Sequence, residues 1–136
     1  MAREFHLSVV APDRAVVEEN ATAVVVPGVD GYFGLLAGHV PLIAALRPGV
    51  MEYTDPSNNR HHVYVGGGFI EVSSGRVSVL ADEAKRAIEI DIATEEKALE
   101  EARKSLRGEE SSIGSEDAVL EIERALQRIK AARVAR

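Results

Sequence analysis

The hydrophobic residues of this chain change their spacing once, near residue 81, and that change limits the folds that the chain can adopt. Before it, apolar and polar residues alternate in short runs, which is typical of strands that bury one face. After it, Ala, Glu, Lys and Arg dominate, and apolar residues recur three and four positions apart, as in amphipathic helices. A length of 136 residues corresponds to about one domain. We therefore predict an α+β protein, with a β-domain first and a smaller helical unit after it.

The first part has the pattern of several short strands. Phe5, Leu7 and Val9 share one face of the first strand, and a β-branched run ends at Pro27. Further runs cover residues 62–65, 69–72 and 76–80, and clusters of Gly, Pro, Asn and Asp separate them, including residues 47–49 and 66–68. Short strands spaced roughly 8–12 residues apart, with no helical pattern between them, predict a β-sandwich or a barrel.

The second part predicts an antiparallel pair of helices. Asp91 or Thr94 can cap the first helix, and Glu100 and Lys104 are spaced as a favourable ion pair. A break around Gly108 and Gly114 separates it from a second helix that starts near Ser115. The two apolar stripes comprise Ala98, Leu99, Ala102 and Leu106, and then Val119, Ile122, Leu126 and Ile129. Because both stripes are narrow and rich in alanine, we expect the hairpin to pack modestly against the β-domain and to detach reversibly.

Composition excludes several classes of function. Without cysteine the chain can form no disulfide, thiolate metal site or cysteine nucleophile. A net charge of -6 argues against free nucleic acid as a partner. No apolar run approaches the roughly 20 residues of a membrane span, so we expect a soluble chain that reaches a membrane only through other proteins.

Two glycine clusters could suggest ligand loops, and we favour a purely structural role for both. A phosphate loop needs a helix directly after its glycines, usually with a lysine, whereas Gly38 is followed by His39, Val40 and Pro41. Turns and close backbone approach are the better account. The three glycines at residues 66–68 lie inside a strand pattern, which favours a bulge or a close backbone contact over a ligand loop.

No catalytic or metal-binding set emerges from the titratable residues. His61 and His62 are adjacent, so on a strand they point to opposite faces and cannot share one metal ion. The acids at positions 82, 83, 89 and 91 lie close to Lys85 and Arg86, which favours a solvated linker over acid–base chemistry. We therefore predict a protein that is not an enzyme.

The last helix carries an excess of positive charge. From residue 122 onward it has five cations against the single acid Glu123, and these cations are Arg124, Arg128, Lys130, Arg133 and Arg136. They could simply complement the helix dipole. They could equally form a docking surface for an acidic partner, because local charge steers association more than net charge does.

Taken together, these segments resemble the epsilon subunit of the F-type ATP synthase, a family called delta in mitochondria, over essentially the whole chain. Residues 30–50 are similar to the family signature of spaced glycines followed by His, Pro and Leu. Residues 13–19, 66–72 and 77–84 are similar to further family landmarks. The signature positions are Gly31, Gly34, Gly38, His39, Pro41 and Leu42.

The resemblance implies a ten-stranded β-sandwich over residues 1–87, followed by a regulatory two-helix hairpin over residues 88–136. It implies a rotor subunit without catalytic residues, cofactor or metal, which binds the gamma subunit and the c ring and couples proton flow to ATP synthesis. We expect it to be peripheral, on the cytoplasmic side of the plasma membrane. The residues facing gamma are not implied, whereas the c-ring interface would comprise Gly31, Tyr32, Phe33, Gly34, Gly38 and His39.

In the family the terminal helices also restrain ATP hydrolysis, by contact with the alpha and beta subunits. The residues that would dock there, on an acidic segment of beta, are Arg124, Arg128, Lys130 and Arg133. Some bacterial members bind ATP through an Ile-Asp-x-x-Arg-Ala motif. Here Ile90 and Asp91 match, but Thr94 replaces the arginine and Glu95 adds a negative charge. We therefore predict no ATP binding, with Asp91, Arg124 and Arg128 as the only candidates, and keep a stand-alone ATP-sensing module as the alternative.

Overall fold

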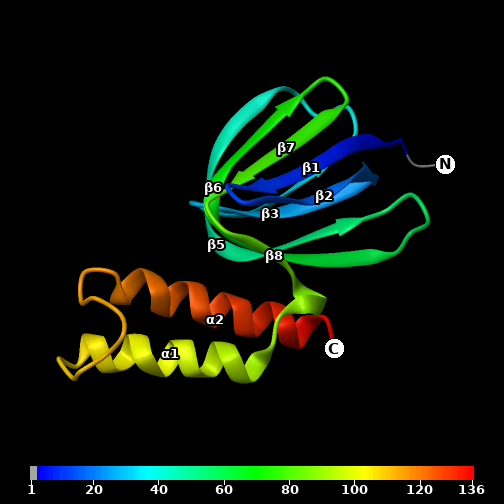
Figure 1. Ribbon diagram of the computed structural model, residues 1–136. Helices are drawn as coiled ribbons and strands as arrows, with labels where there is room; N and C mark the ends of the chain where they lie inside the picture. The colour runs from blue at the N-terminus through cyan, green and yellow to red at the C-terminus, as the bar shows by residue number, and fades with distance from the viewer. Residues whose placement is uncertain (1–2) are drawn as a thin grey trace.

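A computed structural model describes residues 3–136 as a β-sandwich with a helical hairpin packed beneath it (Figure 1). Eight strands come first in the chain. They are β1 (Phe5–Ala11), β2 (Arg14–Ala21), β3 (Ala23–Gly28), β4 (Gly31–Leu36), β5 (Leu42–Thr54), β6 (Arg60–Ser73), β7 (Arg76–Ala81) and β8 (Ala84–Arg86). A short 3-10 turn, η1 (Ala87–Glu89), leads into α1 (Ile92–Leu106) and α2 (Ala118–Val134). The order of β-domain and helices agrees with the sequence prediction.

Two long strands connect the two layers of the sandwich. The strands pair in the order β2-β1-β7-β6-β5-β3-β4, with β8 on β6, and only the β1–β7 pair is parallel among residues 3–136. Layer one contains β2, β1, β7, the end of β6 and the start of β5. Layer two contains β8, the start of β6, the end of β5, β3 and β4. Each layer is therefore built from five strand segments.

The strand count differs from the expected ten because β5 and β6 are continuous. Residues 47–49 and 66–68 have the composition of turns, but in the structure they are bends inside β5 and β6. At the second bend Gly68 has φ +132°, and a Cβ placed there would clash with the carbonyl oxygen of Leu80. Only glycine fits at such a backbone contact. The close backbone approach predicted for the three glycines is thus confirmed.

The main core lies between the two layers. Phe5, Leu7 and Val9 are buried on one face of β1, as their alternation predicts. The other buried residues of this core come from β2 to β8, and the last of them along the chain is Ala84. Every strand therefore contributes to this core, and neither helix does.

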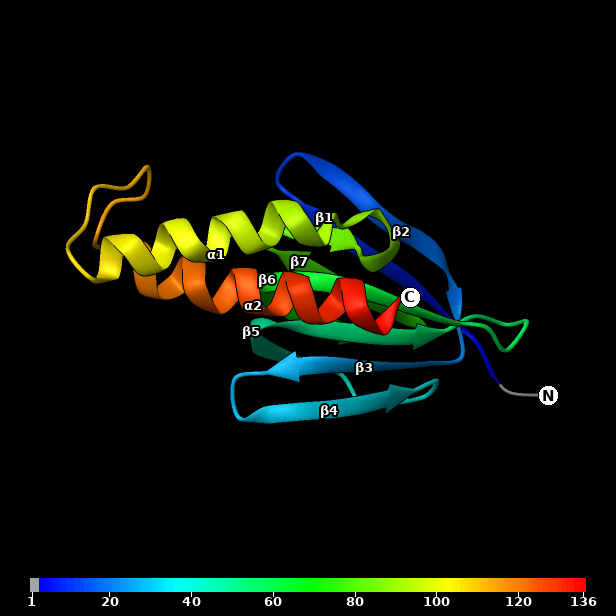
Figure 2. The ribbon, with the colours of Figure 1, turned by 90° about the horizontal axis from the view of Figure 1, so that it is seen from below.

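The hairpin rests on the outer face of layer two. In Figure 2 the helices lie across this face, while β3 and β4 remain beside them. α2 contacts β5, β6 and η1, whereas α1 packs on α2. A second apolar cluster joins the helices to the sandwich and comprises Val50, Tyr64, Ala87, Ile90, Ala131 and Ala132. Because α2 contributes only alanines to this cluster and α1 only the partly buried Ile92, little apolar surface holds the hairpin in place.

The caps and stripes of the helices follow the sequence only in part. Asp91, not Thr94, is the N-cap of α1, and its Oδ2 accepts a hydrogen bond from the backbone N of Thr94. Leu106, Val119 and Leu126 are exposed, contrary to the predicted stripes. The small side chains of α2 face inward together with Ile129 and allow close packing of the helix backbone, whereas Val119 and Leu126 turn outward. These buried small residues are Ala118, Ala125, Ala131 and Ala132.

Surface ion pairs on α1 also differ from the prediction. Glu100 pairs with Arg107 at 3.1 Å, and Lys104 pairs with Glu101 at 3.5 Å, so the expected Glu100–Lys104 bridge is replaced. Arg107 follows the last helical residue and folds back toward both Glu100 and Glu109. Exposed pairs of this kind exchange at little cost, which is why spacing alone does not select between them.

Candidate functional site

Residues 31–39 form an edge strand and a turn, not the single loop that the sequence suggested. Gly31–Leu36 is β4, which pairs only with β3 and ends the sheet. Gly31 and Gly38 have positive φ and lie at the turns on either side of this strand. Six strand residues span roughly 20 Å, so Gly31 and His39 lie at opposite ends of β4. The signature glycines are therefore divided between the two ends of an edge strand.

Tyr32 and Phe33 face opposite sides of β4. The Tyr32 hydroxyl accepts a hydrogen bond from the backbone N of Val50 at 3.0 Å, and the ring lies 5.8 Å from Lys130 Nζ. Phe33 packs against the core and closely over Gly28. Tyr32 is 44% exposed. Of the two aromatic residues, Tyr32 is therefore the one that a partner could reach.

Layer one presents an apolar outer face, on the side of the sandwich away from the hairpin (Figure 1). Val10, Leu80, Phe69 and Ala45 lie in one row across four paired strands, and Ile43 lies beside them. Ile43 is 71% exposed, Phe69 56% and Leu80 53%. Large apolar residues gathered on one sheet face are characteristic of a protein interface. We call Val10, Ile43, Ala45, Phe69 and Leu80 the outer apolar face; the sequence analysis did not identify it.

Arg128 lies in a cluster of carboxylates where the sandwich and both helices meet. Its Nε donates to Glu95 Oε1 at 2.6 Å, and its Nη1 donates to Glu83 Oε1 at 2.6 Å. Its Nη2 donates to Glu121 Oε1. Glu83 precedes β8, Glu95 is on α1 and Glu121 is on α2. One guanidinium thus joins the sandwich to both helices, and the Arg128 side chain is only 10% exposed.

Tyr64 completes this cluster from β6. Its hydroxyl donates to Glu83 Oε1 at 2.6 Å, and its ring lies 5.5 Å from the Arg128 guanidinium carbon. Burial, followed by the hydrogen bond to Glu83, raises the pKa of Tyr64. Burial opposes the charged form of Arg128, but the hydrogen bonds to Glu95 and Glu121 help to raise its pKa overall. The guanidinium therefore stays cationic at every pH at which the protein is folded.

The four cations expected to dock on a partner do not form one open surface in this conformation. Arg124 donates from Nε to the carbonyl oxygen of Gly66 at 3.2 Å, and Arg128 is enclosed. Lys130 lies over Tyr32, and Arg133 is 3.7 Å from Glu96 on α1. A basic surface made of all four requires the hairpin to leave the sandwich.

The three nucleotide candidates are also not equivalent. Asp91 caps α1, and the hydrogen bond from the Thr94 side chain is the main reason that its pKa is lowered. Arg136, not Arg124 or Arg128, lies near this end of α1, where its Nη2 donates to the carbonyl oxygen of Ile90. Asp91 therefore caps the start of α1, whereas Arg124 and Arg128 contact the sandwich from α2.

Sequence reasoning missed the partners of Arg128. Glu83 was assigned to a solvated linker, and Tyr64 to a strand with no further role. One signal was present: Glu95 precedes Leu99 by four residues and so falls on the buried stripe of α1. A charge on the buried face of a helix needs a partner, and Arg128 occupies the matching position on α2.

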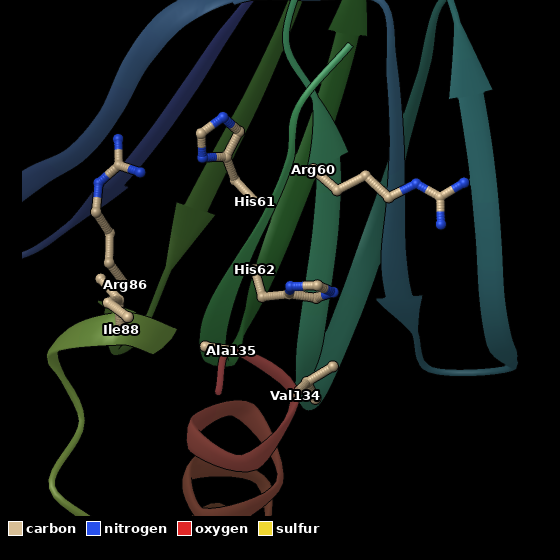
Figure 3. Close-up of a pocket in the computed structure, with 7 residues that line it drawn as sticks. All are labelled: Arg60, His61, His62, Arg86, Ile88, Val134 and Ala135. Atoms are coloured by element: carbon tan, nitrogen blue, oxygen red, sulfur yellow. The ribbon is translucent and has the colours of Figure 1, made fainter.

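A hollow of about 300 Å³ at the end of the hairpin does not form a convergent site. Its lining residues include Arg60, His61, His62 and Arg86. Figure 3 shows Arg60 and Arg86 on different sides of the hollow and extending in different directions, and the two histidines pointing apart. His61 binds Asp55 at 2.9 Å and His62 binds Glu52 at 3.1 Å. The predicted separation of the two histidines is confirmed, although each is paired with an acid rather than simply solvated.

Tyr53 gives the sandwich a measurable sensitivity to alkali. Burial is the main reason that the pKa of Tyr53 is raised to about 12, and a hydrogen bond to Glu19 adds to the shift. The unfolded phenol titrates near about pH 10, so this contribution to stability is complete below about pH 10 and is lost as the pH rises toward 12.

We expect the free energy of unfolding to fall by at most about 1.4 kcal/mol per pH unit for each such tyrosine in that range. Urea unfolding at about pH 9 and about pH 11 measures the fall. Tyr53→Phe removes the titrating group and is expected to flatten the pH dependence, while lysine titration continues in both proteins. An unchanged slope in the variant would contradict the assignment.

Within residues 3–136, no helix has the length and apolar character needed to cross a membrane. The same residues contain no group of three or more His, Asp or Glu arranged to hold a metal ion. The surfaces described above comprise an exposed apolar face, of the kind that proteins use to bind one another, and ion pairs within the chain.

The fold defines a two-part protein, in which a β-sandwich has an exposed apolar face on one layer and carries a helical hairpin on the other. The family described as "ATP synthase, Delta/Epsilon chain, beta-sandwich domain" matches residues 4–87. This chain is 38% identical to the ATP synthase epsilon chain of Nitratidesulfovibrio vulgaris (strain DP4) over 130 residues, which cover 96% of each chain. It is 42% identical to that of Lawsonia intracellularis over 106 residues, covering 78% of this chain and 79% of the relative.

A solved structure extends the likeness to the hairpin. A chain in the cryo-EM structure of the Euglena gracilis mitochondrial ATP synthase, OSCP/F1/c-ring in rotational state 1, superposes with a TM-score of 0.75 at 28% identity. The match covers 97% of this chain and 81% of that chain. The chain belongs to the family of ATP synthase delta/epsilon chains.

Proposed function

We propose that this protein is the epsilon subunit in the central stalk of an F-type ATP synthase, where it joins gamma to the c ring and couples proton flow to ATP synthesis. The observation that carries the proposal is the 38% identity to an ATP synthase epsilon chain over 96% of both chains. The similar solved chain comes from an assembly that includes F1 and a c ring. The subunit would then be peripheral, on the cytoplasmic side of the plasma membrane.

The two proposed partners have different surfaces available to them. The outer apolar face lies away from the hairpin, so gamma can cover it whether the hairpin is folded or open. The turn between β3 and β4 offers exposed Val29 and Tyr32 to the c ring. Gly38 and His39, at the other end of β4, lie nearer the start of β5 and hence the outer apolar face. We therefore assign Gly31 and Tyr32 to the c ring, and His39 to the opposite end of β4.

The hairpin would restrain ATP hydrolysis by leaving the sandwich and docking against the alpha and beta subunits. Opening frees Arg124, Arg128, Lys130 and Arg133 together for that contact. In the folded hairpin, three carboxylates surround Arg128, which counts against a bound triphosphate at this position. The alternative of a stand-alone ATP sensor is therefore less well supported.

Reconstitution with an ATP synthase that lacks its own epsilon subunit tests the proposal. The complex is expected to regain ATP-driven proton pumping when this protein is added. Phe69→Glu places a charge on the outer apolar face and is expected to weaken assembly by roughly tenfold or more. Val119→Glu is the matched control, since Val119 is an equally exposed apolar residue on α2.

A crosslink identifies the c-ring contact in the same complex. Because the chain has no cysteine, Tyr32→Cys introduces a single thiol that should crosslink to a cysteine in the polar loop of c. Phe33→Cys faces the core and is expected to crosslink poorly. Failure to restore pumping would contradict the function, whereas restored pumping without the Tyr32 crosslink would contradict only the assignment of the surface.

A further inference from the structure

The charges around Arg128 do not balance. Three carboxylates, from Glu83, Glu95 and Glu121, contact one guanidinium. Lys85 lines the same hollow of about 350 Å³, but no ion pair joins it to the three glutamates. Because all three carboxylates contact the same guanidinium, they lie close enough together for their like charges to repel. Among residues 3–136, Arg128 is thus the one cation that ion pairs join to these three glutamates, while Arg124 lines a neighbouring hollow together with Glu121.

The three carboxylates also belong to three separate parts of the molecule. Glu83 is in the sandwich, Glu95 on α1, and Glu121 on α2 with Arg128 itself. Repulsion between them therefore acts to separate the helices from the sandwich and from each other. The apolar contact that opposes this separation contains only alanines from α2.

We infer that Arg128 is an electrostatic latch: while its guanidinium binds all three glutamates the hairpin stays folded on the sandwich, and once it is withdrawn their mutual repulsion drives the hairpin open. A partner that offers Arg128 a stronger acidic site would open the hairpin by this exchange. The inference deepens the regulatory part of the proposed function and rests on it only for its consequence in the complex.

The latch is tested in the isolated full-length subunit, so its result does not depend on any partner. Two cysteine pairs carry spin labels, one at Ser74 and Lys97 and the other at Ser74 and Glu123. All three positions are exposed, and the chain has no cysteine of its own. Pulsed electron paramagnetic resonance then measures the distance from the sandwich to α1 and to α2. The unaltered chain is expected to give a single narrow distance distribution for each pair, and opening is expected to add a second one.

Arg128→Gln is expected to increase the open fraction roughly tenfold or more for both label pairs, because it leaves three buried or half-buried carboxylates without their cation. Arg133→Gln removes the same charge from α2 at an exposed ion pair with Glu96 of α1, and is expected to change the open fraction by no more than about twofold. A closed hairpin in Arg128→Gln, or equal opening in both variants, overturns the latch.

Neutralising the carboxylates separates repulsion from lost hydrogen bonds. Adding Glu95→Gln and Glu121→Gln to Arg128→Gln is expected to return the open fraction most of the way toward that of the unaltered chain. If the triple variant stays open, carboxylate repulsion is not the driving force and the inference fails. Hydrogen exchange of the α1 and α2 amides supplies a further check, because loss of helix protection in Arg128→Gln would mean unfolding and would also overturn the latch.

Discussion

Replacing Gly68 by alanine is expected to destabilise the sandwich more than any other single substitution proposed here. The new Cβ would clash with the Leu80 carbonyl oxygen and lie 2.9 Å from Ala81 Cα, so the β6–β7 pairing must separate to admit it. The alanine would also have to adopt φ +132°, a backbone conformation that residues other than glycine rarely tolerate. Overpacking and backbone strain together cost roughly 2–6 kcal/mol. That is a large part of the stability of an ordinary domain.

Gly75→Ala is the matched control for this prediction. Gly75 also has a positive φ, +71°, but nothing lies within 4 Å of an added Cβ. Its replacement therefore incurs backbone strain alone, about 1–2 kcal/mol. Urea unfolding followed by tyrosine fluorescence compares the two variants, since the chain has three tyrosines and no tryptophan. Equal losses would show that the close contact at Gly68 does not control the fold.

Ending the chain after Ala87 is expected to leave a folded sandwich and to release the restraint on ATP hydrolysis. The main core reaches only to Ala84, so it stays complete without the helices. Removal of the hairpin exposes Val50 and part of Tyr64, and we expect only a modest loss of stability. In the reconstituted enzyme, hydrolysis should rise several-fold while proton pumping persists.

A chain that ends after Gly114 controls for the role of α1. It keeps α1 but lacks α2, the element on which α1 packs. We expect α1 to lose its attachment and hydrolysis to rise as in the shorter chain. An unfolded sandwich in the chain ending at Ala87 would contradict the proposed division into residues 1–87 and 88–136, and hydrolysis that stays low would contradict the regulatory role of the hairpin.

The sequence predicted those features that depend on neighbouring residues. Alternation placed Phe5, Leu7 and Val9 in the core because successive side chains of a strand point to opposite faces. The sequence limited the N-cap of α1 to Asp91 or Thr94, because the capping hydrogen bond, from the Thr94 backbone N to Asp91 Oδ2, joins residues three positions apart. The strand count was wrong, because whether Gly66–Gly68 ends a strand or bends it depends on β5 and β7, which pair with it across the fold.

Features that depend on distant residues were missed for the same reason. Glu83 and Arg128 are 45 positions apart, and no local pattern brings them to 2.6 Å. The orientation of α2 was partly wrong because large aliphatic residues were assumed to point inward. Val119 and Leu126 are exposed, and alanines are buried in their place because small side chains let the helix backbone approach its neighbours closely. The c-ring and docking residues themselves remain predictions.

The continuity of β5 and β6 through both layers has a mechanical consequence. In a sandwich whose layers touch only through side chains, a twisting load can slide one layer over the other. Here two adjacent strands of 13 and 14 residues run covalently from one layer into the other and stay hydrogen-bonded to each other on both sides of the bend. Shear between the layers would have to stretch backbone or break that ladder. A sandwich built this way resists such shear across its full thickness, and no residue of the hairpin is part of the connection.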